Sequence, residues 1–257
     1  MRLLSVFLIA VTCSIGNLRA EVLDVSSRGE TTRLLVEQGS EPWVTVVLFT
    51  GGKGVLDISK SGAIGGGENN FLVRTREIFQ NKGAITAVID VPTDRRKKLH
   101  GFRGTKKHAK DIGAVIKHLR AKYGLPVWLV GTSRGTNSVA NSGARHKWAK
   151  PDGIVLTATM LEANDNSDYV LEYNLAKITV PVLIAHHRHD KCWATPPGRV
   201  GELENALINA KPVKVLWYEE KGSTQGKACK PRHYHGLIDI EEKVVADIMA
   251  WIKSPAP

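Results

Sequence analysis

The stretch Leu129–Gly135 reads Leu-Val-Gly-Thr-Ser-Arg-Gly, which places a Gly-x-Ser-x-Gly sequence directly after an apolar run. A serine on a sharp strand-to-helix turn must adopt a strained backbone conformation, and flanking glycines let neighbouring chain approach it closely. Such a turn lifts the Ser133 hydroxyl out of the sheet. It also sets the Arg134 amide at a helix start, where that amide can donate to an oxyanion. We therefore take Ser133 as a candidate nucleophile.

Short apolar runs bounded by turn residues surround this motif and predict β-strands. After an edge strand at Thr32–Glu37, the predicted strands are Trp43–Phe49, Ala84–Asp90, Val127–Val130, Ile154–Thr159, Val182–His186 and Val213–Tyr218. Residues 44–49 are apolar on both faces, as expected of a strand buried between helix layers. Because helical stretches alternate with these runs, we predict an α/β fold whose mostly parallel central sheet is flanked by helices on both faces.

Two stretches carry the spacing of a helix with one buried face. The first covers residues 112–119, and Gly124 ends it. The second covers residues 244–252 near the end of the chain, with Asp239 and Glu242 at capping-box spacing before it. About twenty residues separate the predicted strand that ends at Thr159 from the one that begins at Val182, too few for an inserted helical lid. We expect an open site.

A serine hydroxyl needs a general base near neutral pH, and the base needs an orienting acid. Asp190 follows the predicted strand at 182–186, at the carboxyl edge of the sheet where open α/β folds place their ligands. His235 lies between the last predicted strand and the final helix, with His233 as a competing base. Other histidines crowd beside Asp190 and could bind a metal, but hydrogen-bonded loop histidines are commoner. They are His186, His187 and His189.

The three candidate residues follow one another along the chain in the order serine, acid, histidine. With this order, the chain resembles the α/β-hydrolase superfamily from about Trp43 to Ile252. The resemblance implies that Ser133 attacks an acyl carbon, His235 takes and returns the proton, and Asp190 holds the imidazole. It favours His235 over its neighbour because His-Gly-Leu before a terminal helix is similar to the family's usual setting.

The same resemblance places a second oxyanion donor in the turn after the strand at Trp43–Phe49. That turn reads Thr-Gly-Gly-Lys-Gly over residues 50–54, with Thr50 where the family often has histidine. The departure leaves the donor open between the amides of Gly52 and Lys53. We favour Gly52, with the Arg134 amide as the other donor, over a merely flexible glycine turn.

Residues 1–20 have the layout of a secretory signal peptide: a basic start, an apolar run and a small residue at the cut site, Ala20. The run is too short for a retained anchor, and no transmembrane segment follows. We expect a single domain at 21–257 that is secreted or periplasmic. The leader carries two basic residues and no acidic ones, so the net charge falls from +11 to +9.

Two cysteines remain after such cleavage, Cys192 and Cys229. In an oxidising compartment an isolated pair favours a disulfide over free thiols, and zinc is a weaker alternative because no Cys-x-x-Cys accompanies them. The bridge would tie together the loops that carry Asp190 and His235.

Two further segments stand out. Ser61–Phe71 is glycine-rich but lacks the Gly-Lys-Ser/Thr ending of a phosphate-binding loop, so we interpret it as a mobile loop near the oxyanion turn, and we predict no cofactor.

Arg95–Lys110 is strongly basic. It is either a solvated face, the default, or a docking patch for an acidic polymer or a membrane surface. No motif for specific nucleic-acid binding is present.

These features favour hydrolysis of a carboxylic ester, on a small-molecule or polymer-linked acyl substrate, through an acyl-enzyme on Ser133. A peptidase or amidase could use the same three residues. A non-catalytic binding protein that retains the fold is the alternative from another class, because fold alone does not establish activity.

Overall fold

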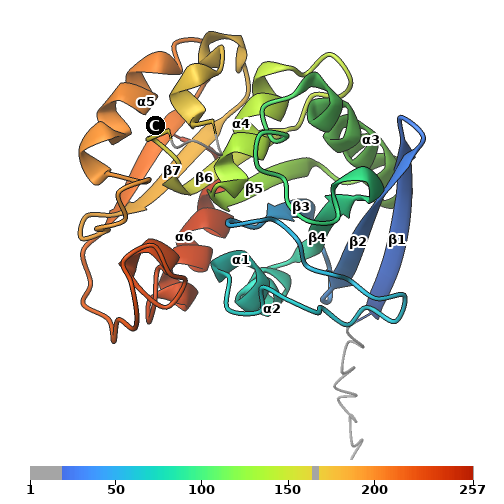
Figure 1. The fold of residues 1–257 in the computed structure, drawn as a ribbon, viewed down its shortest axis with the longest axis horizontal. Helices are drawn as coiled ribbons and strands as arrows, with labels where there is room; N and C mark the ends of the chain where they lie inside the picture. The colour runs from blue at the N-terminus through green and yellow to red at the C-terminus, as the bar shows by residue number, and fades with distance from the viewer. Residues whose placement is uncertain (1–18, 164–167, 257) are drawn as a thin grey trace, which may run out of the picture.

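The computed structural model describes residues 19–163 and 168–256. An eight-stranded sheet crosses the molecule in the order β1-β2-β4-β3-β5-β6-β7-β8 (Figure 1). Its strands are β1 (Arg19–Ser27), β2 (Glu30–Gln38), β3 (Val44–Phe49), β4 (Ala84–Pro92), β5 (Val127–Ser133), β6 (Gly153–Thr159), β7 (Val182–His187) and β8 (Val213–Tyr218). β3 to β8 are parallel, and the β1–β2 hairpin joins β4 antiparallel. The predicted mostly parallel sheet is confirmed.

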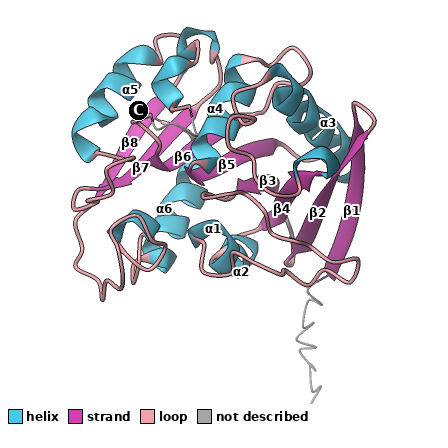
Figure 2. Cartoon of the chain, in the orientation of Figure 1, coloured by secondary structure: helices cyan, strands magenta, loops and turns pink. Residues whose placement is uncertain are grey.

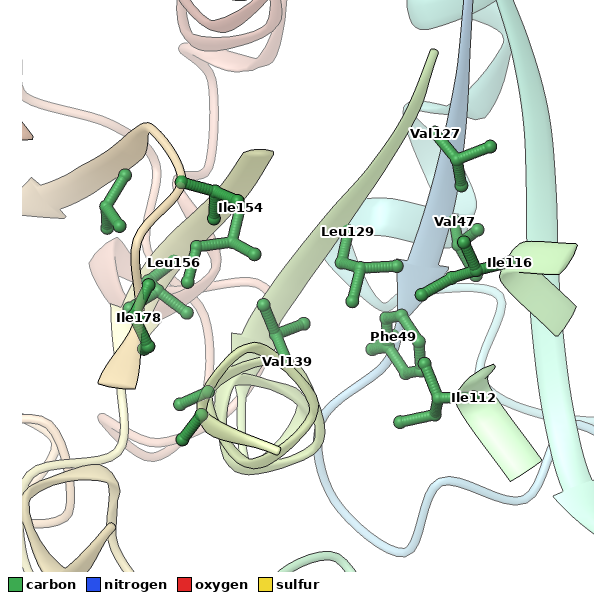
Figure 3. Packing of buried hydrophobic residues seen from close by; sticks show 14 of the residues in the cluster. Val47, Phe49, Ile112, Ile116, Val127, Leu129, Val139, Ile154, Leu156 and Ile178 are labelled. Carbon is green, nitrogen blue, oxygen red and sulfur yellow. The ribbon is translucent and has the colours of Figure 1, made fainter. Parts of the chain in front are cut away.

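Helices cover both faces of this sheet (Figure 2). They are α1 (Phe71–Arg74), α2 (Arg76–Asn81), α3 (Lys106–Tyr123), α4 (Gly135–Ala144), α5 (Val200–Ala206) and α6 (Glu241–Lys253). β3 shows how one strand serves both layers, because successive side chains point to opposite faces. Val47 and Phe49 belong to the core under α3 and α4 (Figure 3), whereas Val46 and Leu48 belong to the core under α1, α2 and α6.

The two helices predicted from periodicity are present, but the predicted capping box is wrong. The apolar stripe of α3 is fully buried, and the helix ends at Gly124 in the left-handed conformation. α6 begins after Ile240, whose side chain makes no capping bond. Asp239 has a φ of +63°, and its carboxylate accepts a hydrogen bond from the Ser223 amide at 2.6 Å. The carboxylate is therefore committed to a neighbouring loop rather than to the helix start.

The strand predicted at Thr32–Glu37 is present as β2, but its predicted place at the edge is wrong, because β2 lies between β1 and β4 and β1 forms the edge. Arg28 and Gly29 both have positive φ and form the two-residue turn of a β1–β2 hairpin. β1 is not among the predicted strands: its first two residues belong to the expected leader, and residues 21–27 follow the expected cleavage site. Most of the predicted signal peptide, residues 1–18, lies outside the described residues. Cleavage after Ala20 would leave residues 21–27 paired with β2.

Between β6 and β7 the described residues form only short 3₁₀ turns, at Val170–Glu172 and Leu175–Lys177. Residues 160–163 and 168–181 therefore place no helical lid over the sheet edge. Among the described helices, none has the length and apolar character needed to span a bilayer.

Candidate active site

Ser133 sits on a strained turn between β5 and α4. Its φ is +52°, a conformation that costs free energy for a residue with a side chain. A Cβ at Gly135 would lie 2.0 Å from the Phe49 carbonyl oxygen, so only glycine lets α4 start this close to β3. The Thr136 hydroxyl donates to the Ser133 carbonyl at 2.6 Å and fixes the first turn of the helix. Backbone packing thus holds Ser133 at the carboxyl edge of the sheet.

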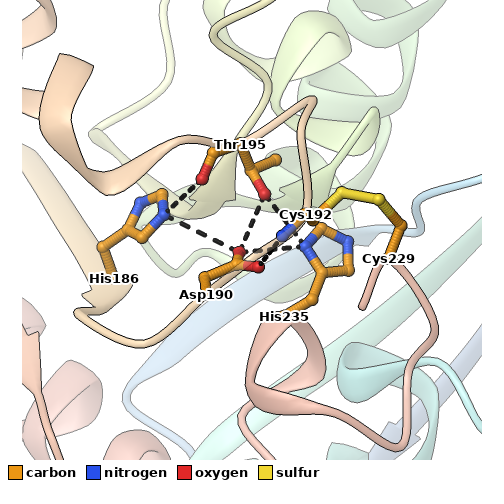
Figure 4. The surroundings of a disulfide bond; sticks show 6 residues. All are labelled: His186, Asp190, Cys192, Thr195, Cys229 and His235. Atoms are coloured by element: carbon orange, nitrogen blue, oxygen red, sulfur yellow. Dashed lines mark hydrogen bonds and ion pairs between the residues drawn. A yellow bond between two sulfur atoms is a disulfide. The ribbon is translucent and has the colours of Figure 1, made fainter. Parts of the chain in front are cut away.

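Asp190 and His235 meet from the loops that follow β7 and β8 (Figure 4). Asp190 Oδ2 lies 3.1 Å from His235 Nδ1, and the Cys192 amide donates to Asp190 Oδ1 at 2.8 Å. Both side chains are buried. Because a carboxylate only accepts, Nδ1 carries the proton and Nε2 is left to act as a base. Within the described residues His233 makes no hydrogen bond or ion pair with Asp190, so His235 is the partner.

The surroundings of Asp190 favour its ionised form. Burial raises the pKa of this carboxyl, but hydrogen bonds from His235, the Cys192 amide and Thr195 outweigh burial and bring its pKa below the ordinary value. A carboxylate that stays ionised can orient the imidazole and stabilise its protonated form.

Thr195 is a residue of this cluster that the sequence did not reveal. Its hydroxyl donates to Asp190 Oδ2 at 2.8 Å and lies 3.1 Å from His235 Nδ1, so it touches both partners at once. Thr195 is fully buried. A lone threonine carries no motif, and only its contacts in the folded chain identify it.

Two of the three histidines beside Asp190, His186 and His187, bond to backbone carbonyls. The Thr195 carbonyl accepts from His186 Nε2 at 3.0 Å, and this nitrogen is 3.8 Å from Asp190 Oδ2. His187 bonds to a backbone carbonyl and stacks on Tyr234. Among the residues that the structure describes, no group of three histidine, cysteine or acidic side chains is arranged to hold a metal ion.

Ser133 and His235 line one pocket of about 330 Å³. The glycine turn at residues 50–54 also lines the pocket and lies directly beside the serine, since a Cβ at Gly51 would be 3.0 Å from Ser133 Cβ. Residues 67–71, the end of the glycine-rich segment, also line it, as expected of a loop near the oxyanion turn. No hydrogen bond joins Ser133 Oγ to His235 in the described part of the chain. Catalytic hydrogen bonds are often long without substrate and tighten when it binds.

The predicted disulfide between Cys192 and Cys229 is confirmed (Figure 4). It joins the loop after β7 to the loop before His235, and Cys229 itself lines the pocket. The bridge therefore constrains both loops that carry the acid and the base.

Among the arginines and lysines of the basic segment Arg95–Lys110, Arg103 is the one that is buried. Arg103 is only 3% exposed, which contradicts its assignment to a solvated or docking face. Its guanidinium donates to Ser138 Oγ at 2.7 Å and to the Thr50 carbonyl at 2.9 Å, and burial lowers its pKa to about 9. The small side chains of α4 leave room for it, and the arginine ties that helix to the oxyanion turn.

The two predicted oxyanion donors lie on neighbouring segments, because the start of α4 packs against the carbonyls of Phe49 and Thr50. Arg134 occupies the N-cap position of α4, and Gly52 lies in the turn that lines the pocket. Arg134 Nη1 is 2.9 Å from His100 Nε2. Burial and the positive charge of Arg134 lower the pKa of His100, which keeps the imidazole neutral so that it can accept this bond. The Leu99 amide donates to the Lys53 carbonyl at 2.9 Å.

By sequence, the chain matches no family model and no curated protein. By structure it is similar to a dienelactone hydrolase from Anabaena variabilis, with a TM-score of 0.64, 13% identity, and coverage of 92% of this chain and 97% of that one. It is similar to a cold-adapted esterase from an Arctic intertidal metagenomic library, with a TM-score of 0.59, 17% identity, and coverage of 90% and 92%.

A third similar structure is an α/β serine hydrolase without a lid from Xanthomonas campestris, with a TM-score of 0.59, 14% identity, and coverage of 93% and 96%. At these identities the likeness defines architecture. The strand order, the crossover between β3 and β4, and the helices on both faces agree with it. The chain has the α/β-hydrolase fold.

Proposed function

We propose that the protein is a serine hydrolase that cleaves carboxylic esters through an acyl-enzyme on Ser133. The observation that carries the proposal is the buried His235–Asp190 pair, whose His235 lines the same pocket as the strained Ser133. Perturbed titratable groups in a cleft mark functional sites, and the pKa of Asp190 is lowered here. Structures of similar fold are named as esterases and serine hydrolases, which supports the reaction class.

In the proposed first half-reaction, Ser133 Oγ attacks the acyl carbon while its proton passes to His235 Nε2. The carbonyl π electrons move to oxygen, and the resulting oxyanion accepts hydrogen bonds from the Gly52 and Arg134 amides. Collapse of this intermediate breaks the ester bond, and the leaving alcohol takes the proton from His235. Asp190 stays ionised throughout and holds the imidazole.

In the second half-reaction, water attacks the acyl-enzyme and passes its proton to His235 Nε2. Collapse of the second tetrahedral intermediate returns that proton to Ser133 Oγ and releases the carboxylic acid. The open pocket admits both the acyl group and water, since no helical lid covers it among the described residues.

A fluorophosphonate probe tests the nucleophile. We expect it to label the folded protein at Ser133, and we expect Ser133→Ala to abolish both labelling and ester turnover. A His235→Ala variant tests the base, with His233→Ala as its matched control; the first should lose labelling and the second should keep it. Labelling that survives Ser133→Ala, or a folded protein that never reacts, would contradict the proposal.

A matched pair of substrates tests the ester assignment. The acetyl ester of 4-nitrophenol and the acetyl amide of 4-nitroaniline carry the same acyl group and differ only in the bond to be cleaved. We expect turnover of the ester and little turnover of the anilide. A preference for the anilide would assign the same residues to an amidase.

We further infer that the protein works in a secreted or periplasmic compartment. The Cys192–Cys229 bridge supports this, because disulfides persist in oxidising compartments and are rare in the cytosol. The test is the N-terminal sequence of the protein recovered from culture medium or periplasm. A start at Glu21 supports cleavage after Ala20, whereas an intact N-terminus would contradict it.

A further inference from the structure

We propose that a basic pocket beside the catalytic pocket binds the anionic part of the ester substrate, and that the substrate is an O-acylated acidic polysaccharide. The proposal rests on the proposed ester hydrolysis and adds the chemical class of substrate. The pocket is the concave surface lined by residues 93–98, 100–102 and 105. We call it the basic pocket.

The basic pocket carries an excess of unpaired positive charge. It has a volume of about 600 Å³ and is lined by Arg95, Arg96, Lys97, Lys98 and a single acidic residue. That acid, Asp94, is within 3.5 Å of Arg28 and 4.0 Å of Arg95.

Within the described residues, the other three cations form no ion pair, and their side chains are exposed. They are Arg96, Lys97 and Lys98. Clustered cations on one concave wall create a positive potential that attracts anionic ligands.

The basic pocket lies next to the catalytic pocket, although no described residue lines both. His100 lines the basic pocket, and its Nε2 is 2.9 Å from the guanidinium of Arg134, the residue after the nucleophile. The Leu99 amide bonds to the carbonyl of Lys53, which lines the catalytic pocket. Contacts made by Leu99 and His100 therefore connect the two pockets.

A repeating acidic chain fits this arrangement better than a small ester does. The catalytic pocket, about 330 Å³, has room for an acyl group and the sugar that carries it. The larger basic pocket then lies where neighbouring sugars of the same chain would run, and their carboxylates meet the cations. A concave site of this kind also favours a chain over a flat membrane surface.

The experiment compares kcat/KM on O-acetylated polygalacturonate and on O-acetylated xylan, which is neutral. We expect the wild-type enzyme to prefer the anionic polymer, and the preference to shrink as NaCl is raised, because salt screens exposed charges. The triple variant Arg96→Gln, Lys97→Gln, Lys98→Gln should lower the ratio of the two kcat/KM values about tenfold.

The matched control removes the same charge elsewhere. Lys117, Lys147 and Lys150 are exposed and line neither pocket, so their change to Gln should leave the ratio within about twofold. An equal fall in both triple variants would show that net charge, and not the basic pocket, sets the preference, and would overturn the proposal.

Two further outcomes separate this inference from the proposed function. If the enzyme cleaves 4-nitrophenyl acetate but has no preference between the polymers, ester hydrolysis stands and the basic pocket proposal fails. If the pocket variant loses binding to phosphatidylglycerol vesicles while its polymer ratio is unchanged, the cations serve a membrane surface and the proposal also fails. An enzyme that cleaves no ester at all overturns both.

Discussion

The candidate site has two regions. The nucleophile side, which is the turn that carries Ser133, is positioned by backbone packing, whereas the acid–base side, which is the pair of loops that carry Asp190 and His235, is positioned by side-chain contacts. Ser133 is held by a left-handed φ and by a glycine packed on the β3 carbonyl. Asp190 and His235 come from separate loops, which hydrogen bonds and a disulfide bring together. Backbone in close contact cannot relax locally, whereas side chains can readjust. Substitutions that disturb the backbone contacts of the first side should therefore lower stability, whereas loss of a single hydrogen-bonding side chain on the second side should mainly lower the rate.

Gly135→Ala should have the largest effect on the fold. The new Cβ would lie 2.0 Å from the Phe49 carbonyl oxygen, so β3 and α4 must separate. We expect a loss of about 5 kcal/mol in the free energy of unfolding, at the upper end of what single substitutions cost. Chemical denaturation measures it, and a poor yield of folded protein would agree.

Gly198→Ala is the matched control on the acid–base side. Nothing lies within 4 Å of a Cβ at that position, so stability should change by less than about 0.5 kcal/mol. If the two variants are equally stable, the nucleophile turn is not held by close backbone contact and the contrast between the two sides fails.

The same contrast explains what the sequence could reveal. The nucleophile turn is local, so Gly-x-Ser-x-Gly after a strand was enough to predict it. Asp190 and His235 could be predicted from the sequence because each follows a strand, and parallel strands end at one edge of the sheet. Thr195 could not be, because its role depends on two loops meeting. Local patterns also misled where distant contacts decide, as Arg103 shows: its place is set by Ser138 and the Thr50 carbonyl.

Removing the disulfide should have the next largest effect. Cys192 and Cys229 are 37 residues apart. Closing a loop of that length lowers the conformational entropy of the unfolded chain, which raises its free energy by about 4 kcal/mol. The double variant Cys192→Ala, Cys229→Ala should lose about that much stability. It should also turn over ester more slowly when folded, because the Cys192 amide donates to Asp190. Denaturation curves and kcat on 4-nitrophenyl acetate measure the two effects.

Reductant supplies the control for this variant. Dithiothreitol should lower the stability of the wild-type protein and leave the double variant unchanged. Wild-type turnover that persists after verified reduction of the bond would show that the bridge holds the fold but not the acid and base.

Acid should destabilise the acid–base side through His186. Burial lowers the pKa of this imidazole from 6.5 to about 4, although Asp190 opposes the shift. Between these values the unfolded chain binds a proton that the folded chain does not, so stability falls as pH drops from 6.5 to 4. The shift corresponds to about 3 kcal/mol. Any stabilisation from the lowered pKa of Asp190 is lost only further down, as pH falls through that lowered value.

Unfolding curves at several pH values test this with a matched pair. His186→Gln removes the titrating group. The fall in the free energy of unfolding between pH 6.5 and 4 should therefore become smaller by about 3 kcal/mol, which gives a flatter pH profile. His118→Gln changes an exposed histidine and should leave the profile unchanged. Identical profiles for both variants would assign the acid sensitivity to other groups.

Thr195→Val should have the smallest effect and is the sharpest test of the acid–base side. Valine keeps the shape of the side chain but removes the hydroxyl that donates to Asp190 and contacts His235. With the proposed ester hydrolysis as readout, we expect kcat to fall about tenfold, as for loss of one hydrogen bond to a charged group. KM should change less than twofold, because Thr195 does not line the pocket.

Thr195→Ser distinguishes positioning from packing. Serine restores the hydroxyl but lacks the methyl group, so it should recover most of kcat if the hydroxyl holds His235 in line with Ser133. If valine preserves kcat while serine lowers it, the residue acts through its volume. Packing would then position the acid–base side as it positions the nucleophile side. The two regions would differ in how tightly they are packed and not in the kind of contact that holds them.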